Sequence, residues 1–201
     1  VEGRTSISTM PVSGGFGIKL KSADGGTISN SVIVRSSLTG VTTYDSSSIN
    51  IVQNRIVFNG IDYGFLDGVD VVSGAEHNIS SNYIVGNRGS GIDTYSSTGG
   101  HIIQGNTVSG NGLSGDEVAG IGRLGDGSTL TLNVIEGNVG DGVLVGGEAK
   151  LFGTSAVTNN RITRNRFIAI GKQEIDLGVL DGDRIHGDGI DSIDGLDATS
   201  G

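Results

Sequence analysis

Isolated apolar residues, separated by polar ones, recur along the chain at a nearly constant interval. The clearest unit is Asn, any residue, an apolar residue, two further residues and a second Asn, as in Asn54–Asn59. Five such units begin at Asn54, Asn82, Asn106, Asn133 and Asn160. Their period of roughly 24–28 residues is typical of a solenoid, in which each coil contacts only its neighbours.

Alignment of the units on their first Asn gives three apolar positions per coil. The first lies three residues before that Asn, in Ile51, Ile79, Ile103, Leu130 and Val157. The second lies two residues after it, in Ile56, Ile84, Val108, Ile135 and Ile162. The third follows a small residue, in Gly60-Ile61, Gly91-Ile92, Gly120-Ile121, Gly142-Val143 and Ala169-Ile170. Isolated, mostly β-branched residues are typical of short strands with one inward face, whereas a helix needs apolar residues at steps of three and four.

The pattern therefore predicts an all-β parallel β-helix with three short strands per coil and about 24–28 residues per coil. Asn30–Arg35 would be the unit of the coil before Asn54, and Phe16–Leu20 would form a strand of an earlier coil. We expect about seven coils, the first incomplete, stacked at about 4.8 Å into a rod of roughly 35 Å. Residues 1–178 would form this single domain, and the Asp/Gly-rich residues 179–201 a last coil or a cap.

The amino-acid composition fits a repeat whose coils turn sharply at several corners. The chain has 37 glycines, one proline and no cysteine, so disulfides and thiolate metal sites are excluded. Glycines would form corners at positive φ. Asparagine also tolerates left-handed φ, and identical Asn side chains stacked coil on coil can form a hydrogen-bonded ladder. We interpret the repeated asparagines as scaffold.

The net charge of the chain limits the classes of partner that we expect. The formal net charge is −9, which disfavours nucleic acid and anionic membranes, because both need a basic surface. No apolar run approaches the roughly 18 residues of a membrane span. A β-helix exposes sheet edges at an uncapped end, so end-to-end self-association is an open possibility.

The Asn-x-Ile-x-x-Asn unit followed by Gly-Ile resembles the repeats of right-handed parallel β-helix proteins of the pectin-lyase-like type. Within that superfamily the chain is most similar to bacterial secreted or surface β-helix proteins, and Glu174–Gly178 is similar to segments that end such repeats. The resemblance implies an extracellular or cell-surface location. Relatives include polysaccharide lyases, glycosidases, uronate epimerases and adhesins, so the fold alone leaves function open. Tyr63-Gly64-Phe65 shares three residues with an epimerase element but lacks its Asp-Pro-His.

The alignment suggests one candidate cation site. Asp62 and Asp93 follow Gly-Ile in the same way, so we expect them about 5 Å apart on adjacent coils, facing solvent. Asp67 and Asp70 follow in an expanded coil. Carboxylates this close bind a cation such as Ca²⁺ or share a proton, and two solvated turn residues are the structural alternative.

Other side chains are candidates for contact with a sugar or for catalysis. Tyr63 and Tyr95 lie near the aspartates and would stack on a sugar ring. His77 and His101 share a position five residues before the leading Asn, as an outward pair or as imidazoles capping turns. Arg88 and Arg123 are candidates for the base of a lyase.

Two functions remain open. The first is a non-catalytic module of a larger surface, adhesive or structural protein that touches polysaccharide or cell-surface glycans. The second is a polysaccharide-acting enzyme, a uronate lyase or a related carbohydrate-active enzyme, with a lyase using Ca²⁺ and an Arg or Lys base. The absence of Trp, an aromatic content of 4% and the regularity of the repeats favour the module.

Overall fold

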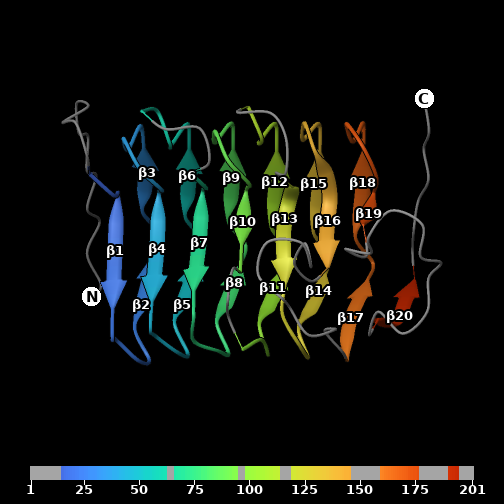
Figure 1. The fold of residues 1–201 in the computed structure, drawn as a ribbon, viewed down its shortest axis with the longest axis horizontal. Coiled ribbons are helices and arrows are strands. Elements are labelled where there is room, and N and C mark those ends of the chain that lie inside the picture. Colours follow the sequence, from blue (N-terminus) through green and yellow to red (C-terminus); the bar gives the residue numbers. More distant parts are fainter. Residues whose placement is uncertain are drawn as a thin grey trace, which may run out of the picture.

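A computed structural model describes residues 15–62, 66–94, 98–113, 119–145, 159–176 and 190–194. Every regular element in these ranges is a short strand, and every pairing between strands is parallel. The strands stack side by side along the long axis of the molecule (Figure 1). The predicted all-β parallel solenoid is therefore confirmed.

Three sheets run the length of the stack, with seven, seven and six strands. The first contains β1 (Ile18–Lys21), β4 (Val41–Tyr44), β7 (Val69–Val72), β10 (Ile92–Asp93), β13 (Ala119–Leu124), β16 (Asp141–Val145) and β19 (Ile175–Asp176). The second contains β2 (Thr27–Ser29), β5 (Asn50–Val52), β8 (Asn78–Ser80), β11 (Ile102–Gln104), β14 (Thr129–Thr131), β17 (Asn160–Thr163) and β20 (Ile190–Asp194). The third contains β3 (Val32–Val34), β6 (Arg55–Val57), β9 (Tyr83–Val85), β12 (Thr107–Ser109), β15 (Val134–Glu136) and β18 (Arg166–Ile168).

Paired residues of neighbouring strands show that the coils vary more in length than predicted. The step from Ile121 to Val143 is shorter than the expected range, and the step from Val143 to Ile175 is longer. The expected count of seven coils is not supported, because the third sheet has six strands within the described ranges. β20 lies within residues 179–201 and pairs with β17, so this segment adds a strand to the second sheet.

The interior is a stack of apolar side chains, with one from a strand of the second or third sheet and two from β7, β13 and β16 of the first. In the second sheet Ile51, Ile79, Ile103 and Leu130 are fully buried and lie in register. In the third sheet Ile56, Ile84, Val108 and Ile135 do the same. Both columns were predicted, and together with the first-sheet residues Val41, Val69, Ile92, Ile121 and Val143 they form one continuous core.

Two ladders of buried asparagines run beside this core. In each ladder the Nδ2 of one Asn donates to the Oδ1 of the next over 2.9–3.1 Å; the ladders are Asn54–Asn82–Asn106–Asn133–Asn165 and Asn59–Asn87–Asn111–Asn138. Each Oδ1 also accepts the backbone N–H of the preceding Asn, as Asn106 does from Asn82 at 2.9 Å. Each Nδ2 also donates to a carbonyl of an apolar residue, as Asn106 does to Ile79 over 2.8 Å. The amides thereby satisfy the backbone of the corners, as predicted.

The left-handed backbone belongs to the residue before each asparagine. Gln53, Ser81 and Leu132 have φ of 57°, 57° and 58°, directly before Asn54, Asn82 and Asn133. The expectation that the corner Asn itself adopts left-handed φ was therefore wrong for these positions. The Asn is free to point inward because its neighbour makes the turn.

Glycine has a second role where the third sheet leads into the first. A Cβ on Gly68 would lie 2.6 Å from the carbonyl oxygen of Gly91 and 2.7 Å from Asn87 Nδ2. Gly40 and Gly120 are similarly crowded by the next coil. Glycine is therefore required at these positions by close packing of coils, not by a positive φ.

Parts of the predicted register were wrong at both ends of the stack. Asn133 is followed in its ladder by Asn165, not Asn160, so Ile162 lies opposite Leu130, and Phe167 lies opposite Ile135. Val143 pairs with Ile175 rather than Ile170. At the other end Ser31, not Asn30, opposes Asn54. Val157 lies outside the described residues.

A further correction concerns the expanded coil. Val69, preceded by Gly68, is the first-sheet residue opposite Ile92, whereas Ile61 is exposed and belongs to no strand. The additional residues of this coil therefore lie before the first-sheet strand. None of the described residues forms a helix of the length and apolarity needed to cross a membrane.

Candidate functional site

Three carboxylates converge on the first sheet. Asp70 on β7 and Asp93 on β10 are directly opposite each other in the parallel register. Asp67 lies just before β7, and one carboxylate oxygen from each of the three residues falls within 4.8 Å of the others. We refer to Asp67, Asp70 and Asp93 as the aspartate cluster.

Backbone contacts between two coils place Asp67 in the cluster. The carbonyl of Leu66 accepts the N–H of Gly89 at 2.8 Å, and Asp67 Oδ1 accepts the N–H of Ser90 at 2.6 Å. Gly89 lacks a Cβ, which would lie 2.5 Å from Asp67 Oδ1. The end of the additional segment is therefore fastened to the turn that leads into β10.

Arg123 completes the site from β13, the first-sheet strand next to β10 on the following coil. Its Nη2 lies 2.6 Å from Asp93 Oδ2, and its side chain is 35% exposed. The pairing of β13 with β16 shifts between Ile121 and Leu124, and Arg123 within this irregularity has φ of 50°. Such bulges re-aim a side chain that a regular strand would direct elsewhere. Gly122, which is opposite Asp93, leaves room for the approach.

Burial dominates the electrostatics of the aspartate cluster. Asp93 is 1% exposed and Asp67 is 7% exposed. Burial raises the pKa of Asp67 well above 3.8, and the charges of Asp93 and Asp70 raise it further. Burial also raises the pKa of Asp70 to about 7, with Asp93 adding to the effect and Arg123 opposing it.

Asp93 is the member of the cluster that keeps its charge most readily. Burial raises the pKa of its carboxyl, but the charge and hydrogen bond of Arg123 counteract this effect. Because the ion pair is short, we place the negative charge of the cluster on Asp93, while burial and that charge favour the protonated forms of Asp67 and Asp70. The cluster could hold a metal ion, since carboxylate oxygens are the ligands of hard cations.

The predicted pairing of Asp62 with Asp93 was wrong. Asp62 is exposed, belongs to no strand, and donates its backbone N–H to the carbonyl of Ser37. Asp70 occupies the register position that was assigned to Asp62. The expectation of a solvent-facing pair was also wrong, because Asp93 is buried.

The other predicted site residues are dispersed. Arg88 is exposed and donates from Nη1 to the carbonyl of Ile61 at 3.1 Å. Arg123 is the candidate base that the fold brings to the cluster. Tyr63 and Tyr95, the predicted sugar-stacking residues, lie outside the described residues.

His77 and His101 share a register position, as predicted, but they face inward. Both are fully buried, and their rings stack at 5.3 Å between centroids with 10° between planes. The Nδ1 of His77 accepts the N–H of Ile49, and the Nδ1 of His101 accepts the N–H of His77, each at 3.2 Å. Ser128 and Asn160 continue this column of acceptors. At a third corner the histidines therefore accept a backbone N–H from the preceding coil, as the asparagines do at the other two corners.

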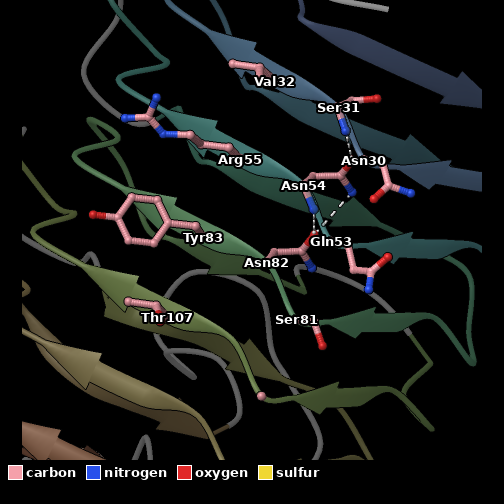
Figure 2. A pocket seen from close by; sticks show the side chains of 11 residues that line it. Asn30, Ser31, Val32, Gln53, Asn54, Arg55, Ser81, Asn82, Tyr83 and Thr107 are labelled. Carbon is pink, nitrogen blue, oxygen red and sulfur yellow. Dashed lines mark hydrogen bonds between the residues drawn. The ribbon is translucent and has the colours of Figure 1, made fainter. Parts of the chain in front are cut away.

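Sequence reasoning missed a surface groove at a different corner. The groove has a volume of about 670 Å³ and lies between the second and third sheets. Figure 2 shows Arg55 and Tyr83 side by side on neighbouring strands, next to the buried Asn54 and Asn82. The guanidinium of Arg55 lies 5.9 Å from the centroid of the Tyr83 ring, and Tyr83 is 47% exposed. The signal for this groove in the sequence was that Arg55 and Tyr83 each directly follow the leading Asn of a repeat, at a position that faces outward.

A family model matches most of the chain. Its description is "Right handed beta helix region", and it matches residues 4–108 and again residues 65–178. The two matches together include nearly all of the stack and agree with the three parallel sheets. No curated protein and no solved structure matches the chain.

Proposed function

The chain belongs to the family of right-handed β-helix regions, and we propose that it is a rigid module of a larger bacterial surface, adhesive or structural protein. The observation that carries this proposal is the pair of Asn ladders. Buried amides of each coil bind the next coil, with the Nδ2 and the Oδ1 both engaged. Such a stack gives a stiff, regular rod, which is the property that a spacer or a display scaffold needs.

An extracellular or cell-surface location belongs to the same proposal. The ladders and the core stabilise the stack without any cysteine, so the module does not depend on an oxidising compartment for folding. The resemblance of its repeats to bacterial secreted and surface β-helix proteins supports the location. Its net charge of −9 is compatible with a calcium-containing exterior.

The groove at Arg55 and Tyr83 is the surface that we propose for contact with glycans. Tyr83 presents an exposed aromatic ring, and Arg55 offers a planar cation that pairs with carboxylates. The exposed side chains of Asn30, Gln53 and Ser81 also line the groove and can bond sugar hydroxyls. Although the net charge of the chain is −9, Arg55 is the one charged residue among the described residues that line the groove, so an acidic polysaccharide is the favoured class because Arg55 would recognise its carboxylates.

Retention of the protein on immobilised pectate, alginate and chondroitin tests this surface. Tyr83→Ala should weaken retention on the polysaccharide that binds the wild type. Tyr44→Ala is the matched control, because Tyr44 is a similarly exposed tyrosine on a strand of the first sheet. Equal weakening by both variants, or no retention of the wild type, would contradict a glycan role for the groove.

A uronate lyase is the second candidate, and the position of Arg123 beside the aspartate cluster favours it. In such a reaction a cation at the aspartates would neutralise the uronate carboxylate. Arg123 would have to lose its own proton to solvent before it could take the C5 proton; the electron pair of that C–H bond would then form the C4–C5 double bond, the bond from C4 to the glycosidic oxygen would break, and water would protonate the leaving oxygen. The substrate would have to reach Arg123, which is partly exposed, and Asp70, which is less buried than Asp93.

Ultraviolet absorbance of the unsaturated product separates the two candidates. The protein is incubated with pectate, alginate or chondroitin in CaCl₂. The module predicts no increase in absorbance, whereas the lyase predicts an increase that Arg123→Ala abolishes. An increase that depends on Arg123 would replace the first proposal with the second.

A further inference from the structure

We infer that Asp67, Asp70 and Asp93 bind one structural divalent cation of the size of Ca²⁺, which fastens β7 and the turn before it to β10. This role goes beyond that of a rod or a glycan-binding surface. It concerns how two coils are held together where the additional segment rejoins the stack.

The spacing of the carboxylates suits a single ion. Two oxygen ligands of Ca²⁺ at about 2.3–2.6 Å from the ion lie at most about 5 Å apart. The three oxygens of the aspartate cluster lie within 4.8 Å of one another. Three oxygens that surround one Ca²⁺ ion evenly lie at most about 4.5 Å apart, so the cluster needs no more than a small rotation of its side chains to close on the ion.

An unsatisfied buried oxygen points independently to a ligand. Asp93 is 1% exposed, and its Oδ2 is held by Arg123, but its Oδ1 has no hydrogen-bond partner. An ionised carboxylate with one orphaned oxygen is costly in a buried site. The opposing residue on β13 is Gly122, and a Cβ added there would lie 3.6 Å from this oxygen. The oxygen thus faces a position that no side chain of the opposing residue fills.

Charge defines the valence of the ion. Three carboxylates and the Arg123 guanidinium sum to −2 when all four groups are ionised, so one divalent cation neutralises the site. All three acidic ligands are hard oxygen donors, which suit Ca²⁺ or Mg²⁺ rather than soft metals. Mg²⁺ requires near-ideal octahedral geometry at about 2.0–2.1 Å, whereas Ca²⁺ accepts longer and less regular sets of oxygen ligands, so Ca²⁺ is the better match to side chains held by two coils.

Burial favours a structural role over contact with a polymer. Asp67 is 7% exposed and already accepts the N–H of Ser90, so it cannot turn outward without breaking that bond. An ion between Asp67, Asp70 and Asp93 would instead join side chains from two successive coils. It would reinforce the contact that Leu66 and Gly89 make through their backbones.

Calorimetric titration of the full chain with CaCl₂, after treatment with EDTA, tests the inference together with thermal unfolding in CaCl₂ and in EDTA. We expect one ion per chain and a melting temperature that rises with CaCl₂, since a ligand that binds only the native state stabilises it. Asp70→Asn and Asp93→Asn should each weaken binding by about tenfold or more and remove the rise in melting temperature. Asp62→Asn is the matched control and should behave as the wild type.

Several results would overturn the inference. They are no heat of binding and no shift in melting temperature for the wild type, equal loss of binding in Asp62→Asn, or equal affinity for MgCl₂. The wild-type comparison decides the matter even if a variant does not fold, which circular dichroism would show. Retention on glycans through Tyr83 is measured in EDTA, so failure of the groove and failure of the cation site are distinguishable.

Discussion

At the residue scale, the fold depends on side chains that accept a backbone N–H from the coil before them. Asparagine does so in two ladders, and His77, His101, Ser128 and Asn160 do so in a third column. These residue types differ in size and charge but share an acceptor atom at a similar reach. A corner position therefore requires a side chain with a hydrogen-bond acceptor at this reach. Asparagine meets the requirement best, because its NH₂ group also donates a hydrogen bond.

Asn106→Ala is predicted to destabilise the protein by about 3 kcal/mol or more, because it removes four buried hydrogen bonds. The N–H of Asn82 and the carbonyl of Ile79 lose the partners that the Asn106 amide gives them, and the Nδ2 of Asn82 and the Oδ1 of Asn133 each lose one of two partners. Urea unfolding followed by circular dichroism measures the loss. Thr107→Ala, next on the strand but with its side chain outside the ladder, should change stability little. Equal effects of the two substitutions would argue against the ladder.

The buried histidines predict a dependence of stability on pH. Burial lowers the pKa of His101 from 6.5 to about 4, and His77 contributes to the effect; burial also lowers the pKa of His77. Between these values the unfolded chain binds the proton and the folded one does not. The contribution of the histidines to stability is therefore fully present above about pH 6.5 and is lost as the pH decreases toward 4, by up to about 3 kcal/mol for His101.

His101→Asn isolates this contribution, because Asn160 already fills the same column. The variant keeps an acceptor for the N–H of His77 and loses the titrating group. Its stability, measured by urea unfolding at pH 7 and pH 5, should fall less on acidification than that of the wild type. An unchanged difference between the two pH values would show that His101 does not titrate in this way.

At the element scale, strands of the described core contribute one or two inward residues, and neighbouring coils pack closely where glycine precedes the first sheet. Gly68 leads directly to Val69 and to Asp70, so its close packing against Gly91 sets the register of the aspartate cluster. The register of such a short strand therefore depends on the close packing of the glycine before it as well as on the hydrogen bonds of the strand itself.

Gly68→Ala should destabilise the protein by about 1–3 kcal/mol, since the new Cβ would lie 2.6 Å from the carbonyl oxygen of Gly91 and the backbone must move. Gly15→Ala is the control, because nothing lies within 4 Å of its Cβ position. Thermal unfolding of both variants measures the difference. A Gly68→Ala protein as stable as the control would show that the two coils are not packed as described.

Much of the fold could be predicted from the repeat, and the errors have a common physical origin. His77, Asn82 and Asn87 mark successive corners at equal steps along the chain. Two asparagines separated by one such step therefore fit either pair of corners, which is why Asn160 and Asn165 were misassigned. The aspartate cluster was misassigned for a related reason. Both Gly60-Ile61 and Gly68-Val69 fit the pattern, and only packing against Gly91 selects the second.

At the scale of the whole molecule, three sheets continue through the stack (Figure 1). The core and the three columns of corner acceptors run along these sheets. The regular part explains shape and stability, and functional features arise where the pattern is broken. The aspartate cluster lies where extra residues rejoin the first sheet, and Arg123 reaches it from an irregular strand. The groove at Tyr83 uses outward positions that the core leaves unconstrained.

The central claim is the register that places Asp70, and not Asp62, opposite Asp93. The chain has no cysteine, so paired substitutions report this register without interference. Neighbouring strands are about 4.8 Å apart, within the range that a disulfide spans. On mild oxidation, Asp70→Cys with Asp93→Cys should form an intramolecular disulfide detected by mass spectrometry, whereas Asp62→Cys with Asp93→Cys should not. A disulfide in the second pair and none in the first would contradict the account.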